Sequence, residues 1–541
     1  MKVNNIQVPH IPEEEKTPLV VALLNIIENQ QALIQGMAET IQQLKDEIAR
    51  LKNHNQKPKI KPSKLNDPKS ENKENQKNDN GKRPGSAKKS KTADLKIHKV
   101  ETIEPENIPE GSVFREYRDF VVQDIILESC NTQYRLKVYE TADGKLISGK
   151  LPEHLDGKHF GGDLISFCLY QNYHCGVTQP LLLDQLHDLG VEISNGQLNN
   201  ILIENKDLYH NEKERILEAG LKYSSYVNVD DTGARHDGKN GYCTHVGNED
   251  FAWFESTESK SRINFLKLIR AGNTDYHINE QAINYMRENK LPNYILDIIT
   301  VHTDLDFPDD KSWEDFLAAN NIEKAHHIKI ATEGALTGSI AENGISDDLV
   351  IVSDDAGQFN VFLHGLCWIH AERLIAKIVP YTEEAGKDLE NIRSRIWDFY
   401  DKLKDYKQQP TGEFKEQLEA EFDEIFTTQT SSAILNNALK RLWKNKTELL
   451  LVLERPEIPL HNNTAENSIR EYVKKRKMSG STRSDEGRRC RDTFASLKKT
   501  CLKQGISFWR YLKDRVFKRL SIPHLSDLIQ QNAEKQVAGS I

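Results

Sequence analysis

Three acidic residues of this 541-residue sequence stand where a regular element ends or begins. Asp230 follows the β-prone run Tyr226–Val229, and Asp354 follows the apolar run Leu349–Val352. Glu466 belongs to the first turn of a predicted helix. Taken singly, such an Asp is usually a turn residue and such a Glu a surface ion pair. Together, carboxylates from distant parts of a chain are what a two-metal phosphodiester site needs, because Mg²⁺ prefers oxygen ligands.

The two strand-end sites each contain a second acid, so Asp231 and Asp355 remain alternatives to their neighbours. The run Leu349–Val352 is continuously apolar, which predicts a buried central strand. For Asp230, the preceding run predicts a position at the edge of the sheet. Ligands of open α/β sheets gather at strand ends, which favours a shared site.

Basic residues surround the third acid. Asn462 or Asn463 can cap the helix, and Arg470 lies one turn after Glu466 on the same face. Residues 471–520 hold 16 Lys/Arg against five Asp/Glu, among apolar residues typical of folded structure. The predicted phosphate contacts are Arg470, Lys474, Lys475 and Lys477.

Further elements must position these residues. The segment Asp237–Gly241 reads as a hairpin turn, followed by predicted strands at Tyr242–Val246 and Phe251–Phe254. Helical periodicity recurs within 270–325 and again within 375–455.

The N-terminal part predicts a coiled coil at 18–52 and a disordered basic linker at 53–100. The coil has Val or Ile at one heptad position and Leu or Met three residues later, interrupted by Gln30. Residues 51–100 hold 15 Lys/Arg against five Asp/Glu and few apolar residues, so they cannot offset the entropy of ordering.

Two further regions precede the sheet. Alternating runs around Phe120–Glu128 and Gln133–Glu140 predict a small β module at 112–150. Region 151–222 is helical, and a helix ending at Gly190 before one capped by Ser194 has helix-turn-helix spacing. Any helical hairpin has the same spacing, so DNA contact is one of two interpretations.

Composition limits the protein class. The net charge of −9 hides the local basic regions, so it does not exclude a nucleic-acid partner. The seven cysteines are scattered without a CxxC pair, which argues against a zinc ribbon. No apolar stretch is long enough to span a bilayer and no signal-peptide core is present, so we expect a cytoplasmic protein without membrane contact.

The sequence resembles the IS66-type transposases over most of its length. The motifs that carry the resemblance are VDDTG at Asp230, SDDAGQF followed by GLCWIHAERLI, and NNTAENSIREYVKKRKMSG before SLKKTCLKQGISFWRYL. The resemblance implies an α/β, ribonuclease H-like catalytic fold with Asp230, Asp354 and Glu466 as metal-binding catalytic residues. It also places His370 and Arg373 near the site, as further candidates for DNA contact.

The resemblance implies a catalytic domain at 223–500 and a helical C-terminal region at 501–541. Because the acids lie far apart in the sequence, helical insertions are expected near 270–325 and 375–455. Relatives commonly carry a cysteine-based zinc module after the linker, but here that region holds only Cys130, so no zinc is expected. The implied cofactor is Mg²⁺, with Mn²⁺ as an alternative.

The expected function is a DNA transposase that cuts element ends and joins them to target DNA. Its expected partners are double-stranded DNA, a second copy of the chain through the coil, and helper proteins, and it would associate with the nucleoid when bound. Two alternatives remain: a metal-dependent nuclease without joining activity, and a non-catalytic coiled-coil DNA-binding protein. Acids within a basic groove would repel DNA unless metal neutralised them, which disfavours the second.

We predict that residues 20–51 make the protein at least dimeric, because the apolar seam would otherwise be exposed beside a solvated tether. Sedimentation of the full chain should give a larger assembly than a chain that starts near residue 100. Identical monomeric masses for both would refute the coiled coil.

Overall fold

The computed structural model describes most of the chain from residue 96 onward. The described residues are 96–539, apart from gaps at 153–154, 156–158, 302–305, 344, 346–347 and 381, together with Thr17, Val20 and Gln30. The predicted coiled coil and the linker as far as residue 95 therefore lie outside the described residues, except for those three positions.

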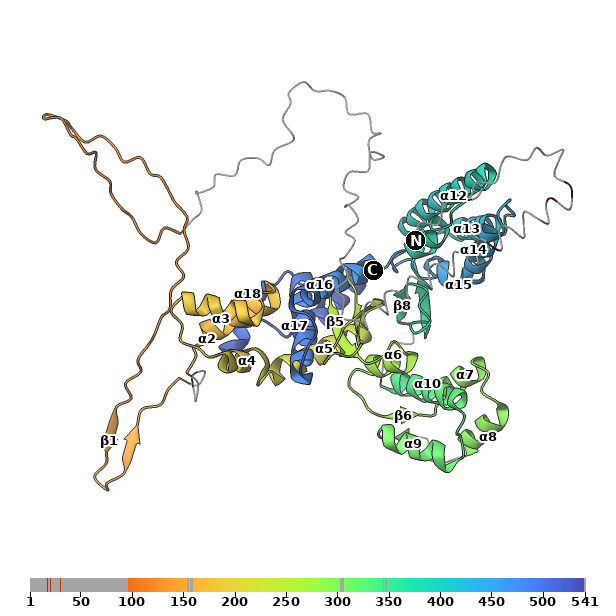
Figure 1. Ribbon diagram of the computed structural model, residues 1–541, viewed down its shortest axis with the longest axis horizontal. Coiled ribbons are helices and arrows are strands. Elements are labelled where there is room, and N and C mark those ends of the chain that lie inside the picture. Colours follow the sequence, from red (N-terminus) through yellow and green to blue (C-terminus); the bar gives the residue numbers. More distant parts are fainter. Residues whose placement is uncertain are drawn as a thin grey trace. The chain divides into compact units, whose positions relative to one another are not determined.

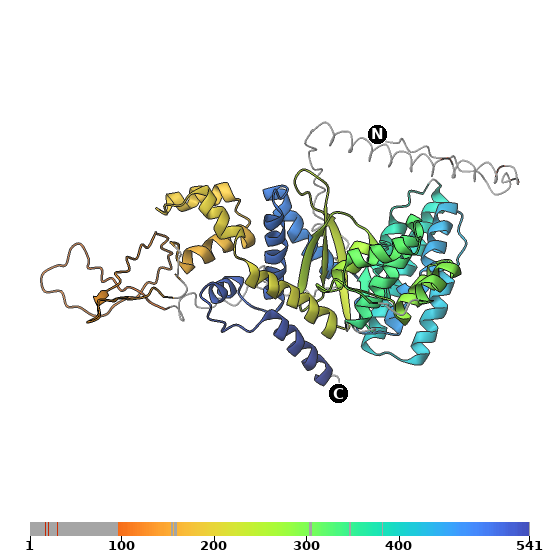
Figure 2. The same cartoon turned by 90° about the horizontal axis from the view of Figure 1, so that it is seen from below.

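A five-stranded mixed sheet carries the predicted strand-end acids (Figures 1 and 2). Its strands are β3 (Tyr226–Gly233), β4 (Tyr242–Gly247), β5 (Ala252–Thr257), β8 (Val350–Ser353) and β9 (Leu363–Leu366). Their order is β5-β4-β3-β8-β9, with antiparallel pairing on the β4 side of β3 and parallel pairing on the β8 side. The predicted strands at β4, β5 and β8 are confirmed, and all of β8 is buried.

The predicted edge position of Asp230 is wrong, because β3 lies in the middle of the sheet. The strand also continues past Asp230 to Gly233, paired with β4. Its pairing with β8 ends at Asn228. Sequence alone missed this because β8 is supplied by a segment more than one hundred residues later.

The hairpin between β3 and β4 turns where the sequence predicted. Asp237 and Gly238 both have positive φ, 44° and 71°, and His236 and Lys239 pair across the turn. Two consecutive left-handed residues are what a tight hairpin requires, and Asp-Gly is a favoured pair for them.

Helix α17 (Asp485–Lys503) covers the free edge of β5 with polar side chains. The backbone N–H groups of Ser256, Phe254 and Ala252 donate to Asp492, Ser496 and Thr500, at 2.9, 2.9 and 3.1 Å. These three acceptors are spaced four residues apart and so share one helix face. The helix therefore satisfies donors that an edge strand would otherwise leave open.

Helices from both ends of the chain share one hydrophobic core with the sheet. They are α2 (Gly162–Leu169), a π-helical turn (Tyr170–His174), α3 (Gln179–Asp188), α4 (Asn195–Ile203), α5 (Asp207–Tyr223), α17, α18 (Phe508–Val516) and α19 (Leu525–Gly539). A buried ion pair of 2.9 Å joins Arg515 of α18 to Glu212 of α5. Residues on both sides of the predicted domain boundaries at 222/223 and 500/501 share this hydrophobic core. Helix α17 continues across the boundary at 500/501.

The predicted break between α3 and α4 is confirmed. Gly190 has a φ of 76°, and Ser194 caps α4 in a reciprocal capping box with Gln197. DNA contact by this pair of helices stays a prediction.

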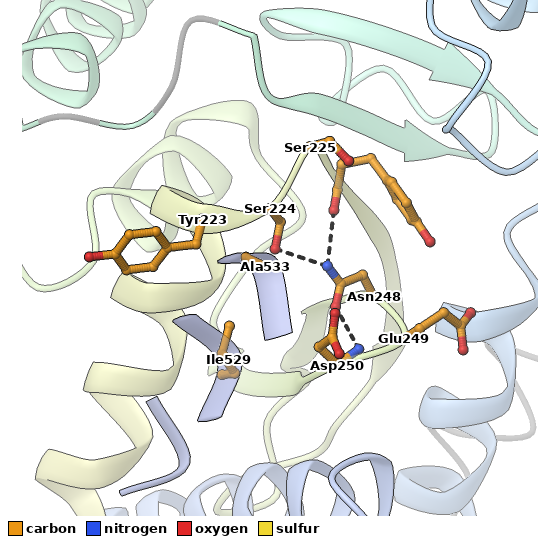
Figure 3. A pocket seen from close by; sticks show the side chains of 9 residues that line it. Tyr223, Ser224, Ser225, Asn248, Glu249, Asp250, Ile529 and Ala533 are labelled. Atoms are coloured by element: carbon orange, nitrogen blue, oxygen red, sulfur yellow. Dashed lines mark hydrogen bonds between the residues drawn. The ribbon is translucent and has the colours of Figure 1, made fainter. Parts of the chain in front are cut away.

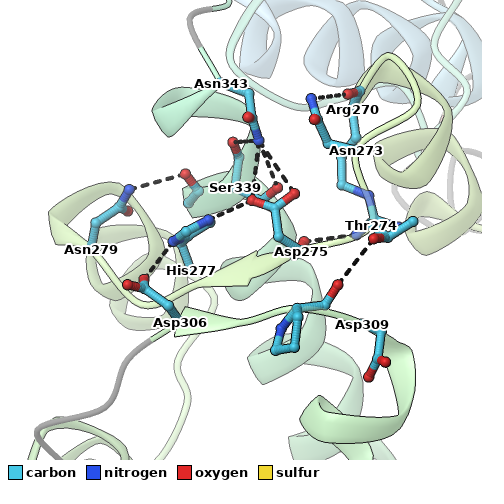
Figure 4. A network of polar contacts seen from close by, with 12 residues as sticks. Arg270, Asn273, Thr274, Asp275, His277, Asn279, Asp306, Asp309, Ser339 and Asn343 are labelled. Carbon is cyan, nitrogen blue, oxygen red and sulfur yellow. Dashed lines mark hydrogen bonds and ion pairs between the residues drawn. The ribbon is translucent and has the colours of Figure 1, made fainter.

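The segment between β5 and β8 forms a helical group whose buried residues belong to the same hydrophobic core as the sheet. It contains α6 (Arg262–Ile269), β6 (Tyr276–His277), α7 (Glu280–Glu288), α8 (Asn293–Val301), β7 (Asp306–Phe307), α9 (Asp310–Ala319) and α10 (Ala325–Glu342). Figure 4 shows its polar network, in which His277 contacts Asp275 and Asp306, the latter at 2.5 Å. Asn343, just after α10, donates to Asp275 at 3.2 Å and so ties this helix to the segment that leads into β6, which pairs with β7.

A second helical group follows β9 and packs around its own apolar cluster. It contains α11 (Trp368–Ala376), α12 (Glu383–Gln408), α13 (Gly412–Phe426), α14 (Ala433–Lys444), α15 (Lys446–Leu449) and a 3₁₀ turn (Leu451–Leu453). The helical periodicity recognised within 375–455 corresponds to α12–α15.

The region of the predicted β module at 112–150 contains only a two-stranded hairpin, β1 (Val138–Glu140) with β2 (Leu146–Ser148). The run around Phe120–Glu128 forms no strand, and its apolar side chains are exposed except for the half-buried Val121. An alternating pattern forms a stable strand only when a partner and a core are available.

The start of β3 is fixed by Asn248, which follows β4. Its side-chain amide donates to the Ser224 hydroxyl at 2.9 Å, and its oxygen accepts from the backbone N–H of Asp250 at 2.8 Å (Figure 3). These bonds border a small hollow that Ile529 and Ala533 of α19 also line. Among the described helices, none is long and apolar enough to cross a membrane.

Candidate active site

The register of β3 and β8 brings two predicted acids together. Tyr226 pairs with Val350 and Asn228 with Val352 in the parallel ladder. The ladder ends there, and continuing its register for two more residues would set Asp230 opposite Asp354. Because opposite residues of neighbouring strands share a face, both carboxylates belong to the same side of the sheet.

That side of the sheet is covered by α16 (Asn463–Ser479). Asn228 and Thr232, the residues two before and two after Asp230, contact the helix region through Asn462 and Arg476, at 2.9 and 3.4 Å. Since residues at this spacing point to the same face, Asp230 also points toward α16.

Asn462 fixes the start of α16 against β3. Its side-chain amide donates to the Val229 carbonyl at 2.7 Å, and its oxygen accepts from Asn228 at 2.9 Å. Its backbone N–H donates to the Cys367 sulfur at 3.2 Å. The residue occupies the predicted cap position, but its side chain makes no cap hydrogen bond. It links the sheet to the helix instead, directly beside Asp230.

Glu466 lies in the first turn of α16 and faces α11. Its Oε1 is 3.4 Å from Nη1 of Arg373 and 3.8 Å from Nε2 of His370. The Arg373 and His370 nitrogens are 3.3 Å apart. His370 and Arg373 of the CWIHAER motif therefore both lie beside Glu466.

The electrostatics of Asp230 reflect its burial and the neighbouring acids. The pKa of Asp230 is raised to about 7, first by burial and then by the negative charges of Asp354, Asp231 and Glu466. A hydrogen bond from the backbone N–H of Asp231 opposes part of this rise. A buried carboxylate among other negative charges is a site that attracts a cation.

The two neighbouring acids are held by other partners. Asp231 pairs with Lys260 and accepts a 2.8 Å hydrogen bond from Gln358. Asp355 pairs with Arg441. In contrast, the Asp354 carboxylate accepts from the backbone N–H of Ala356 at 3.1 Å. The geometry thus favours Asp230 and Asp354 over the alternatives.

His245 lies opposite Asp230 on β4 and is completely buried. Burial lowers its pKa to about 3, with the charges of Lys503 and Lys499 adding to the effect. The imidazole is therefore neutral and brings no positive charge to the carboxylates. Sequence reasoning missed His245 and the role of Asn462, because both depend on register and on a contact between distant segments.

The predicted phosphate-binding residues have different surroundings. Arg470 and Lys477 are exposed, and Lys474 is exposed with a 2.9 Å ion pair to Glu471. Lys475 instead donates to the backbone and side-chain oxygens of Asn172. Burial, together with Arg491 and Lys498, lowers the Lys475 pKa to about 8. The Lys475 ammonium therefore points toward Asn172 in the protein interior and not toward solvent.

Comparison with known proteins gives two matches. Residues 343–489, which include Asp354 and Glu466, match the description "Transposase IS66 family". A 303-residue segment is 42% identical to "Uncharacterized protein y4jO" of Sinorhizobium fredii (strain NBRC 101917 / NGR234). That alignment covers 56% of this chain and 94% of the relative.

The family match and the fold define a transposase-type α/β protein. The chain belongs to the IS66 family of transposases.

We predict that Asn462→Ala lowers stability and DNA cleavage together. The substitution leaves the buried amide of Asn228 without its partner, which costs about 1–3 kcal/mol. It also frees the start of α16, and so the position of Glu466. Thermal unfolding and cleavage of DNA should be compared with the exposed control Asn463→Ala, which should resemble the wild type. Equal behaviour of the two variants would exclude the anchoring role.

Proposed function

We propose that this protein is a DNA transposase that cleaves the ends of an insertion sequence and joins them to target DNA. The observation that carries the proposal is the convergence of three acids from distant parts of the chain: Asp230 within β3, Asp354 directly after β8 and Glu466 in the first turn of α16. Each comes from a different part of the sequence, and a basic helix surface continues from the third.

The strand order supports a ribonuclease H-like core for this activity. An antiparallel meander of three strands, β3-β4-β5, is extended on the other side of β3 by the parallel strands β8 and β9. In chain order, Asp230 then belongs to β3, the first strand of the sheet, and Asp354 directly follows β8, the fourth strand. These two strands are neighbours in the sheet.

The donor set fits a divalent cation. Three carboxylates offer only hard oxygen atoms. Burial, and then the charges of Asp354, Asp231 and Glu466, raise the pKa of Asp230, and a bound cation would oppose this rise. Mg²⁺ or Mn²⁺ held by Asp230, Asp354 and Glu466 would activate an attacking water or DNA 3′ hydroxyl and stabilise the leaving oxygen.

The protein's own residues prepare this site. Asn462 positions the start of α16, while Lys260 and Arg441 hold Asp231 and Asp355 in separate ion pairs. Arg373 and His370 keep the Glu466 side chain on the α11 side. When a cation occupies the carboxylates, Arg373 becomes available for a DNA phosphate, since guanidinium groups bind phosphate oxygens well.

The proposed partner is double-stranded DNA, bound next to Glu466 through Arg470, Lys474 and Lys477. These side chains belong to the exposed part of α16, as far as its last turn. The chain acts as a dimer or higher oligomer in this proposal, as transposon ends must be brought together.

We predict that Asp230→Asn, Asp354→Asn and Glu466→Gln each abolish cleavage and joining. The amides keep the side-chain shape but remove the charged oxygen ligands that Mg²⁺ requires. Asp355→Asn is the matched control and should retain most activity, because its partner is Arg441. DNA binding by gel shift should survive in all four variants, and circular dichroism should confirm folding. Normal cleavage by folded Glu466→Gln would reject the triad.

The same assay separates the alternative functions. Labelled element ends, Mg²⁺ and a plasmid target report cleavage and joining in one reaction. Cleavage without joined product would favour a nuclease, whereas DNA binding without either product would favour a non-catalytic protein.

We also predict a marked salt dependence of DNA affinity, despite the net charge of −9. Replacing Arg470, Lys474 and Lys477 by Gln should flatten the slope of log K against log salt by about one unit for each lost phosphate contact. Lys475→Gln is the control, since its ammonium already contacts Asn172. A slope unchanged in the triple variant would place the DNA surface elsewhere.

A further inference from the structure

A second cluster of metal-ligating side chains lies away from the carboxylates, between α5 and α17. His210 comes from α5, and Glu486 and Cys490 come from α17. One ligand atom of each lies within 4.8 Å of the other two. The closest approaches are 3.2 Å from His210 Nε2 to Glu486 Oε1 and 4.0 Å from His210 Nε2 to Cys490 Sγ.

The two α17 residues are spaced one helical turn apart, so their side chains project to the same side of the helix. His210 meets them from the neighbouring helix and is 1% exposed. The cluster therefore needs no rearrangement of the backbone to bring nitrogen, sulfur and oxygen together.

A further contact orients the imidazole. Its Nδ1 is 2.8 Å from the Thr493 hydroxyl oxygen, which is completely buried within α17. When Nδ1–H donates to this hydroxyl, the lone pair of Nε2 points toward Glu486 and Cys490. Ligand histidines in metal sites are commonly held by such a hydrogen bond on the other ring nitrogen.

The spacing fits a tetrahedral ion. With metal–ligand distances of about 2.0–2.3 Å, the edges of a tetrahedron are about 3.3 Å between N and O and about 3.6 Å between N and S. The observed separations of 3.2 and 4.0 Å are close to these edges. The Glu486 side chain is 47% exposed, so it can adjust its position and open a path for the ion.

The charges of the three ligands would balance that of a divalent ion. A divalent cation, a Cys490 thiolate and a Glu486 carboxylate sum to zero, and a neutral His210 adds no charge. The thiol of Cys490 lies 3.5 Å from the Ile203 carbonyl oxygen, to which it donates its proton. That proton is released to solvent when the sulfur binds the ion.

We propose that His210, Glu486 and Cys490 form a second metal site, which takes a borderline-soft divalent ion such as Zn²⁺ and leaves one position for water. This donor set differs from the carboxylate triad, because nitrogen and thiolate ligands favour Zn²⁺ over Mg²⁺. The site is also distinct from a cysteine-pair zinc module, since it contains a single cysteine.

The site would join three segments of the chain. Cys490 contacts the end of α4 through Ile203, His210 belongs to α5, and α17 covers the edge of β5. A bound ion therefore links the helices that precede the sheet to the helix that closes its edge, and it should raise the stability of the folded state.

The test uses the full-length protein, freed of metal with a chelator and titrated with Co²⁺ and then Zn²⁺. Thiolate ligation of Co²⁺ should give a charge-transfer absorption band at one equivalent, which Zn²⁺ should remove. Oxygen ligands of the carboxylate triad give no such band, so binding of Co²⁺ at that site does not imitate the result. The melting temperature should rise with Zn²⁺.

Cys490→Ser should lose the band, whereas Cys501→Ser, a buried cysteine of the same helix, should keep it. Thr493→Val should retain the band and weaken Zn²⁺ binding roughly tenfold or more, because the imidazole loses its orienting partner. Glu486→Gln changes a partly exposed position and should fold normally, yet weaken Zn²⁺ binding. No band in the wild type, or an equal band in Cys490→Ser, would overturn the proposal.

Discussion

The contact between Asn462 and the backbone of β3 sets the geometry on which the candidate active site depends. A buried amide that both donates to Val229 and accepts from Asn228 has no freedom to slide, because either bond would be lost in a low-dielectric interior. The start of α16 thereby takes its position from the sheet. Glu466 is one turn further along the helix, so its distance from Asp230 follows from this single polar contact.

Much of this arrangement could be predicted from local patterns. The apolar run before Asp354 predicted a buried strand, the Asp-Gly turn predicted the β3–β4 hairpin, and Ser194 predicted the start of α4. These features depend on neighbouring residues, for which periodicity and turn chemistry are informative.

Features that depend on distant segments could not be predicted in the same way. Asp230 was expected at a sheet edge because β8 is not visible from the residues around β3. Lys475 looked like its basic neighbours, although Asn172, some three hundred residues earlier, accepts its hydrogen bonds. The run around Phe120–Glu128 is rich in β-prone residues but forms no strand. For Asp230 and Lys475 the deciding partner is far away in the sequence, and for the run at Phe120–Glu128 the local pattern cannot reveal that a pairing strand is missing.

The α17 side chains that accept hydrogen bonds from the edge of β5 are synthesised long after that strand, which has a consequence for folding during translation. The acceptors on α17 follow the strand's N–H groups by 236 to 248 residues. At a synthesis rate of about 5–20 residues per second, β5 would wait roughly 12–50 s for its cover. During that interval the strand presents open donors to any other extended chain. Truncated copies that end before α17 would keep this edge permanently, and such chains would pair with one another through it.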